Sequence, residues 1–280
     1  MLEPEELGQS KKDLAQYLRE LRKASGLSGE RLAVRSGISQ SKISKIETGK
    51  VLPALSDVER IIAALDVPQD IAQEITSLVR ITHTEFADLR SSLKKGLHRK
   101  QGELASFEAN ASHMRFFLPS MLTGLLHTPE YAKASLETIP GDHSKAIARR
   151  IERQAVLYDT SKHFTFILTE QALRWPLCDP VVMAMQVGRI ATLAMLPNIV
   201  VGVIPLGPRQ LSEGPLSTFT LYDESLVTAE TFGGAVLMKD PRDIAYHLGL
   251  FKVFESYALQ REESKAFLAT VQSEFIQSRE

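Results

Sequence analysis

Glycines at three regular positions break the first fifty residues into short segments, and this punctuation restricts the fold more than any other feature. Gly26, Gly37 and Gly49 are separated by eleven and twelve residues, and Ser28 and Ser39 follow the first two. Glycine commonly ends a helix, and serine commonly caps the N-terminus of the next one. The pattern therefore predicts a series of short helices joined by tight turns.

The third of these segments, residues 39–50, contains few apolar side chains. Only Ile43 and Ile46 are apolar, and the other side chains are mainly Ser, Gln, Lys and Thr. Two short helices joined by a glycine-containing turn, the second capped and polar, describe a helix-turn-helix. The second helix of this motif meets base edges in the major groove, where amide, hydroxyl and lysine groups bind bases. The segment therefore predicts a recognition helix for double-stranded DNA.

Two further helices complete the N-terminal region. Residues 57–66 carry apolar side chains at helical spacing, with Ser56 as the predicted N-cap. Residues 68–80 begin with a proline, which suits the first turn of a helix. Together with the three helices described above, these segments predict an all-α head of five short helices over residues 10–80.

Charge is distributed unevenly along the chain. Residues 10–50 contain ten Lys and Arg against four Asp and Glu, whereas residues 101–280 contain 16 against 20. A basic head followed by a mildly acidic body indicates that the head alone meets a polyanion. Residues 81–103 are polar and basic and predict a linker or an exposed helix between two domains, with contact to the DNA backbone as the alternative.

The remaining residues, 104–280, mix helical and strand patterns. Helices are predicted over 104–117, 128–139, 144–159, 179–196 and 240–275, the second capped by Thr128 and the fourth by Asp179. Strands are predicted over 163–170, 198–206, 216–223 and 225–232. These patterns predict an α+β body with a small sheet of three to four strands.

The stretch LRELRKASGLSGERLAVRSGISQSKISKIETGK, residues 18–50, resembles the XRE-type, lambda-repressor/Cro-like helix-turn-helix family. The resemblance rests on the LRxLR opening, the GLS turn, the LA pair, the SGIS turn and the ISKIExGK close. It implies that Arg22 and Glu47 form a structural ion pair, with a contact of Glu47 to cytosine as the alternative. Gly29 departs from the family, which usually has a phosphate-binding Gln there.

DNA contacts are predicted at hydroxyl, amide and lysine side chains of the head. The predicted residues are Ser28, Ser39, Gln40, Ser41, Lys42, Ser44, Lys45, Thr48 and Lys50. Since one head reads only a few base pairs, we expect a homodimer on a palindromic operator.

The body also resembles a known domain, which follows an XRE head in actinobacterial antitoxin-like regulators. The resemblance rests on LLHTPEYA, RRIERQ, TEQALR and PNIVVGVIP, which occur in this order; Thr123 and His127 stand where that family usually has Pro and Gln. It implies a small partner protein that controls a DNA-binding dimer. The alternative is a one-component regulator whose body binds a small molecule between its sheet and its helices.

Two clusters in the body invite a functional interpretation that we do not favour. Glu170, Arg174 and Trp175 are expected at a strand-to-helix junction, with Arg174 binding loop carbonyls and Trp175 half buried. The charged face of the helix over 144–159, which carries Arg149, Arg150, Glu152 and Arg153, is expected to be solvated or at an interface.

Several classes of protein are not expected from this sequence. Cys178 is the only cysteine, which excludes an internal disulfide and fits a reducing cytoplasm, with association to the nucleoid when bound to DNA. No apolar stretch reaches the length of about 18 residues that a membrane span needs. HExxH, GxSxG, P-loop and GxGxxG motifs are absent. We therefore predict no enzyme activity, no cofactor and no metal.

Overall fold

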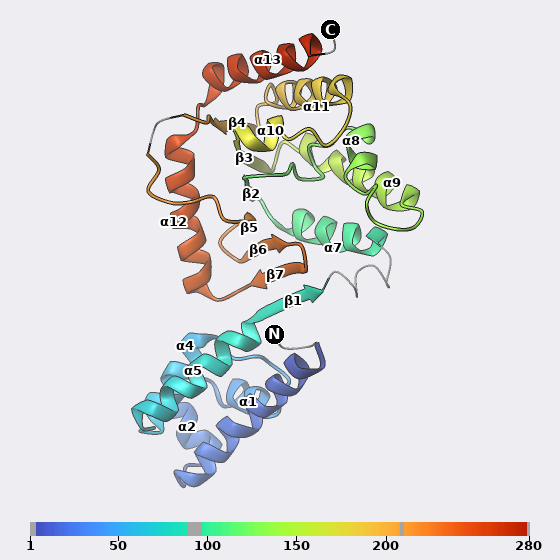
Figure 1. Ribbon diagram of the computed structural model, residues 1–280. Coiled ribbons are helices and arrows are strands. Elements are labelled where there is room, and N and C mark those ends of the chain that lie inside the picture. Colours follow the sequence, from blue (N-terminus) through green and yellow to red (C-terminus); the bar gives the residue numbers. More distant parts are fainter. Residues whose placement is uncertain (1–3, 89–96, 208–209, 279–280) are drawn as a thin grey trace. The chain divides into compact units, whose positions relative to one another are not determined.

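The computed structural model describes residues 4–88, 97–207 and 210–278 (Figure 1). The chain divides into two compact units. The first, called the head here, comprises Met1–Phe86 with Met238–Asp240, and the second, the body, comprises Ala87–Leu237 with Pro241–Glu280.

Residues 4–83 of the head are all-α, as predicted, with five helices. They are α1 (Pro4–Ala24), α2 (Gly29–Ser36), α3 (Gln40–Glu47), α4 (Leu55–Ala64) and α5 (Gln69–His83). Their apolar faces meet in one core, which includes Leu14, Leu18, Leu32, Ile43 and Ile46. Burial of these side chains holds the helices together, of which α2, α3 and α4, at 8, 8 and 10 residues, are too short to be stable alone.

The turns between the head helices confirm the predicted punctuation. Gly26, Gly37 and Gly49 all have positive φ, at 71°, 65° and 68°, a conformation that other residues adopt only with strain. Ser28 Oγ accepts a hydrogen bond from the backbone N–H of Arg31 at 3.2 Å, as an N-cap does. The turn chemistry therefore sets where α2 begins and ends.

The predicted start of α4 is wrong by two residues. Ala54, not Ser56, is the N-cap, and the helix begins at Leu55. Ala54 has no side-chain acceptor of its own, but Asp57 reaches back to accept the backbone N–H of Ala54 at 3.2 Å. A carboxylate in the first turn thus takes over a role that the sequence alone assigned to the nearby hydroxyl.

The region predicted as a linker contains regular structure where it is described. Helix α5 extends to His83, β1 spans Thr84–Asp88, and α7 begins at Leu97. Residues 89–96 lie outside the described residues, so a linker there stays a prediction.

The described part of the body contains seven α-helices and one 3₁₀ helix. They are α7 (Leu97–Asn110), α8 (Pro129–Ala134), α9 (Ser144–Arg153), η1 (Gln154–Tyr158), α10 (Glu170–Arg174), α11 (Pro180–Leu193), α12 (Pro241–Tyr257) and α13 (Arg261–Gln277). Thr128 and Asp179 cap α8 and α11, as predicted, and each is followed by a proline at the first helical position.

The sheet of the body has six strands among the described residues, not the predicted three to four. They are β2 (His113–Leu118), β3 (His163–Thr169), β4 (Ile199–Ile204), β5 (Thr218–Tyr222), β6 (Leu226–Thr231) and β7 (Gly234–Met238). Their order is β7-β6-β5-β2-β3-β4, with β2, β3 and β4 parallel and β5 antiparallel to both β2 and β6.

Two strands and one helix break are not visible in the sequence pattern, for identifiable reasons. Strand β2 overlaps the end of the helix predicted over 104–117, because its last three residues, 116–118, form a buried apolar run instead of an alternating pattern. Strand β7 is a short segment of five residues that begins with the second glycine of a pair. The single helix predicted over 240–275 is two helices, since Leu259 leaves the helical path to exchange backbone hydrogen bonds with Val203 on β4.

Helices cover both faces of the parallel strands. One face, which carries Phe116 and Phe166, belongs to a core shared with α11 and α13, and these two helices lie side by side in Figure 1. On the other face, Phe117 stacks on Phe254 of α12 with ring centroids 3.9 Å apart. The alternation along β2 therefore divides its side chains between two layers.

Candidate nucleic-acid interface

Helix α3 presents one polar face to solvent and anchors the other in the head core. Ile43 and Ile46 are each 1% exposed. Helical periodicity places Ser41, Ser44 and Lys45 on the opposite face, and all three are exposed. The helix therefore keeps a complete row of hydrogen-bonding groups free of the core.

Several predicted contact residues have no side-chain partner in the part of the chain that the structure describes. Gln40, Ser41, Ser44, Lys45 and Lys50 form no side-chain hydrogen bond or ion pair among the described residues. Their amide, hydroxyl and ammonium groups can therefore bind bases or phosphates without first breaking an internal bond.

Other predicted contact residues already have structural roles. Ser28 caps α2, and Ser39 caps α3 by accepting the backbone N–H of Lys42 at 3.3 Å. Thr48 donates its hydroxyl to the carbonyl of Ser44 at 2.7 Å. These hydroxyls first fix the ends of the helices, and any DNA contact that they make is additional.

Lys42 is held by a carboxylate of the neighbouring helix. Its Nζ lies 2.8 Å from Asp57 Oδ2, and Arg60 Nη2 lies 2.8 Å from Asp57 Oδ1. Burial alone would raise the pKa of Asp57, but the hydrogen bonds from Lys42 and Arg60 outweigh it and lower that pKa. Much of the charge of Lys42 is thus already balanced, which the sequence did not indicate.

Arg22 and Glu47 form the ion pair that the family resemblance implied. Arg22 Nε and Nη2 donate to the two Glu47 oxygens at 2.6 and 2.8 Å, and Nη1 donates to the carbonyl of Leu27 at 2.9 Å. The hydrogen bond to Glu47 raises the pKa of Arg22. This geometry ties α1 to the end of α3 and occupies both Glu47 oxygens.

Gly29 stands at the first position of α2, next to the capping Ser28. A Cβ built on Gly29 would meet no atom within 4 Å, so the space for a longer side chain is open. The departure from the family at this position therefore removes a candidate phosphate contact without any packing reason.

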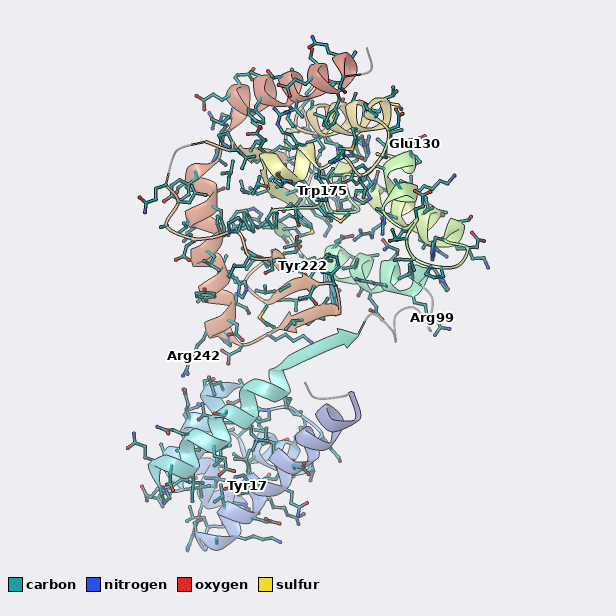
Figure 2. The ribbon with its side chains drawn as sticks, viewed as in Figure 1. Tyr17, Arg99, Glu130, Trp175, Tyr222 and Arg242 are labelled. Atoms are coloured by element: carbon teal, nitrogen blue, oxygen red, sulfur yellow. The ribbon has the colours of Figure 1, made fainter. Side chains whose placement is uncertain are left out.

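The cluster around Arg174 in the body is a structural junction. Arg174 pairs with Glu170 and with Glu274 of α13, so it binds carboxylates and not the loop carbonyls that we predicted. Glu170 also accepts the backbone N–H of Leu206 at 2.7 Å. Trp175, labelled in Figure 2, follows α10 and is 54% exposed, close to the half burial that we expected. These bonds tie α10 to α13 and to the end of β4.

The expectation of a solvated arginine face on α9 is wrong for two of its residues. Arg149 and Glu152 are exposed, as expected, and they pair with each other. The Arg153 side chain is only 5% exposed and pairs with the buried Glu108. Arg150 also points inward and donates to Ser135 Oγ at 2.8 Å. A buried helix face is normally recognised from apolar residues at every third or fourth position. In RRIER the residues that face inward, Arg150 and Arg153, are charged, so the sequence contained no sign of their burial.

No group of His, Cys, Asp and Glu within residues 4–88, 97–207 and 210–278 is arranged to hold a metal ion. Over the same residues, no helix is long and apolar enough to cross a membrane.

Comparison with known proteins assigns both units to families. Residues 101–270 match the family described as "Domain of unknown function (DUF5753)", and residues 13–74 match a helix-turn-helix domain family. The chain belongs to the DUF5753 family. Its head is a helix-turn-helix domain, so the recognition from sequence is confirmed for both units.

Among curated proteins, the head is similar to the uncharacterized HTH-type transcriptional regulator RghRB of Bacillus subtilis (strain 168). The two are 48% identical over 56 residues, which are 20% of this chain and 40% of the relative. The match thus lies within the length of one head and spans well under half of the relative.

Solved structures give only distant matches. NucT from Helicobacter pylori aligns with 64% of this DUF5753 chain and 98% of its own, at 14% identity and a TM-score of 0.38. Nuc, a phospholipase D family member from Salmonella typhimurium, aligns with 57% and 90%, at 11% identity and a TM-score of 0.34. With scores this low, neither match bears on the function of the chain.

Proposed function

We propose that this DUF5753 protein is a sequence-specific DNA-binding transcriptional regulator that reads its operator with α3. The observation that carries the proposal is the exposed row of Gln40, Ser41, Ser44 and Lys45, free of internal partners among the described residues and set on a helix fixed by two buried isoleucines. A Gln can bind adenine with two hydrogen bonds, and a Lys can donate to guanine. The curated relative of the head is named a transcriptional regulator, which supports the same role.

The test is a pair of substitutions on the reading face. Gln40→Ala with Lys45→Ala removes both base-reading groups and leaves the core untouched, so the fold should persist. Each group should supply about 1–3 kcal/mol of discrimination, so the double variant should lose at least tenfold in preference for the operator over unrelated DNA. Gln73→Ala, on the exposed surface of α5, is the matched control. Footprinting of the protein's own promoter region measures the effect, and unchanged protection by the double variant contradicts the assignment.

We also infer that the protein acts as a homodimer on a two-fold operator, with the body as the dimerising unit. A single head covers few base pairs, and pairing of heads gives the affinity that specific regulators need. Sedimentation of the full chain should give twice the mass of one chain, and a fragment that ends at residue 88 should be monomeric. A monomeric full chain contradicts the dimer, and a dimeric fragment contradicts the role of the body.

Control through the body is proposed in two forms, both without catalysis. In the first, a small partner protein binds the body in an antitoxin-like arrangement, which the sequence resemblance supports. Co-expression with a short neighbouring reading frame tests it, since a partner should copurify and change operator affinity. In the second form, the body senses a small molecule. A cavity lined by Arg150 and Arg153 of α9 favours this form.

A further inference from the structure

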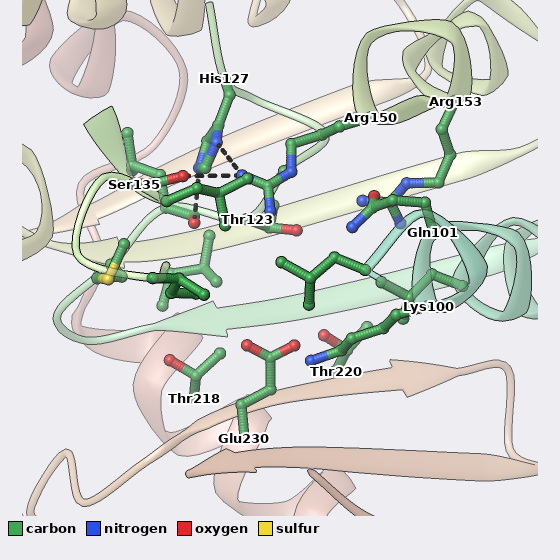
Figure 3. Close-up of a pocket in the computed structure, with 18 residues that line it drawn as sticks. Lys100, Gln101, Thr123, His127, Ser135, Arg150, Arg153, Thr218, Thr220 and Glu230 are labelled. Atoms are coloured by element: carbon green, nitrogen blue, oxygen red, sulfur yellow. Dashed lines mark hydrogen bonds between the residues drawn. The ribbon is translucent and has the colours of Figure 1, made fainter. Parts of the chain in front are cut away.

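A cavity of about 210 Å³ lies in the body beneath α9 (Figure 3). Its walls come from α7, from the end of β2 and the segment before α8, from the turn after α8, from α9, and from β5 and β6. All of these elements belong to the body. The volume is slightly below the range of about 300–1,000 Å³ typical of ligand pockets, and suits a small metabolite.

Positive charge predominates on the cavity wall. Lys100, Arg150 and Arg153 line it, against a single carboxylate, Glu230. Arg153 is bonded to the buried carboxyl group of Glu108. Figure 3 shows Glu230 on the strand side of the cavity, opposite the arginines, and it forms no ion pair with Arg150 among the described residues.

The two hydrogen bonds of Arg150 both go to neutral groups. It donates to Ser135 Oγ at 2.8 Å and to His127 Nδ1 at 3.2 Å (Figure 3). His127 Nε2 donates to the carbonyl of Leu122 at 3.0 Å, so Nδ1 is left as the acceptor. Burial, together with the charge of Arg150, lowers the pKa of His127 to about 3. The histidine therefore stays neutral, and it accepts a hydrogen bond from Arg150 without offsetting the positive charge of the guanidinium group.

Polar atoms around the cavity also lack partners. Arg150 Nε and Arg153 Nε, both donors, are buried without a hydrogen bond among the described residues. Buried polar atoms in native proteins are nearly always bonded, so such a group of unbonded atoms indicates a missing partner. Burial, together with the charge of Arg153, lowers the pKa of Arg150 to about 10, and Glu230 offsets this shift only in part. An acceptor that carries negative charge would remove this cost.

Gly124 permits the close approach of the two arginines to the backbone. A Cβ at this position would lie 3.0 Å from Arg150 Cδ and 3.0 Å from Arg153 Nη2. Both distances are tighter than ordinary packing, so a methyl group here would push the two arginine side chains aside by a few tenths of an ångström. The arrangement of both cations therefore depends on a glycine in the wall.

The rest of the wall is mixed in character. Apolar side chains from several elements line it, namely Leu97, Leu104, Leu118, Met121, Leu136 and Ile139. The hydroxyl-bearing residues Thr218 and Thr220 face the arginines from the strand side in Figure 3. Such a cavity suits a molecule with an anionic end and an apolar remainder.

We propose that this cavity binds a small organic anion, whose carboxylate or phosphate is held by Arg150 with Arg153 beside it and whose apolar part packs against the leucines. Arginine binds both groups through paired N–H donors. The binding itself does not depend on the proposed DNA-binding function. Only its use as a signal, by which the ligand changes operator affinity, rests on that function.

The experiment uses the full chain and four defined probes: hexanoate, hexyl phosphate, inorganic phosphate and, as the uncharged control, hexanol. At saturation, hexanoate or hexyl phosphate should raise the melting temperature by about 4 °C or more, and hexanol should not. The acid that gives the larger shift distinguishes a carboxylate ligand from a phosphate ligand. If inorganic phosphate matches hexyl phosphate, the apolar wall plays no part and the proposed ligand class is wrong.

Matched variants locate the binding. Arg150→Gln should weaken binding of the effective probe at least tenfold in calorimetry, whereas Arg149→Gln, one residue away on the exposed face, should bind like the wild type. Gly124→Ala keeps every charge but displaces both arginines, and should also weaken binding, which covers the case in which Arg150→Gln does not fold. Equal binding by all variants, or no stabilisation of the wild type by either hexyl probe, overturns the proposal. Lys45→Ala should retain full ligand binding, so failure of the cavity and failure of the DNA-binding proposal remain distinguishable.

Discussion

The head and the body each contain an arginine–glutamate pair, but the surroundings of the two pairs differ. In the head, Arg22 and Glu47 satisfy each other through two hydrogen bonds and remain 15% and 11% exposed. In the body, Arg153 and Glu108 are 5% and 2% exposed, and each keeps a buried polar atom without a partner among the described residues. The charged groups of the head pair therefore satisfy each other, whereas each residue of the body pair has one polar atom that is still free to form a hydrogen bond.

The difference extends to how each unit responds to pH. In the head, the pKa of Asp57 is lowered, since the hydrogen bonds from Lys42 and Arg60 outweigh burial. In the body, burial raises the pKa of Glu108 to about 7, although Arg153 and Lys162 oppose the shift. Carboxylates of the two units thus depart from their ordinary pKa in opposite directions.

The largest expected effect comes from breaking the pair of the head. Arg22→Met removes both hydrogen-bond donors of Glu47 and the donor to the carbonyl of Leu27. Because the pair is not fully buried, the free energy of unfolding should fall by about 2–4 kcal/mol. Hydrogen exchange of the peptide that contains Ile43 and Ile46 measures the destabilisation and assigns it to the head. The double variant Arg22→Met with Glu47→Leu should recover part of the stability, and no recovery would mean that the pair is not the cause.

A second prediction concerns Glu108. The pKa of Glu108 is about 4.5 in the unfolded chain and about 7 in the folded body. Between these two pH values, Glu108 is therefore protonated in the folded state and ionised in the unfolded state. The body should therefore become less stable by roughly 2 kcal/mol as pH rises through this window, and Glu108→Gln should flatten the dependence. Thermal melting followed by the fluorescence of Trp175, the only tryptophan of the chain, tests it. A wild-type profile as flat as that of the variant would show that Glu108 is ionised throughout.

The complementary trend is expected in the head. Since the pKa of Asp57 is lowered, its contribution to stability is present above the ordinary pKa of an aspartate and disappears as pH falls below it. Asp57→Asn should remove this acid sensitivity without changing the profile of the body. Hydrogen exchange of α4 between pH 5 and pH 3 distinguishes the two units, and a decline in the variant equal to that of the wild type would contradict the assignment.

The smallest expected effect separates lysines that look alike in the sequence. Lys50 has no internal partner among the described residues, so Lys50→Ala should reduce the salt slope of DNA binding by about one if its ammonium neutralises one phosphate. Lys42 is already paired with Asp57, so Lys42→Ala should reduce the slope by less. Titrations at several salt concentrations measure both, and a larger effect at Lys42 would show that DNA displaces Asp57.

The reading face of the head was predictable because it depends on local rules. Ser28 and Ser39 cap helices, and Gly26, Gly37 and Gly49 end segments through positive φ, all within a few residues of sequence. The pairing of Lys42 with Asp57 was not predictable in this way. It joins residues fifteen positions apart on two helices, and only their packing brings the charges together.

The body shows the limit of local rules more clearly. Thr128 and Asp179 start helices where the sequence places them, but the end of β2, residues 116–118, is an apolar run that does not alternate because tertiary packing covers both of its faces. Burial of Arg150 and Arg153 was likewise hidden, since arginines on an amphipathic helix ordinarily face water.

The sequence by itself determined the helix-turn-helix, the division into a basic head and an acidic body, and the resemblance of each to a known domain. Caps, turns and periodicity act over a few residues, so they are visible without a structure. The tertiary structure alone decided which charges are compensated. Glu47 meets Arg22 and Asp57 meets Lys42, whereas Arg150 donates its hydrogen bonds to neutral groups, because those encounters depend on how distant segments pack.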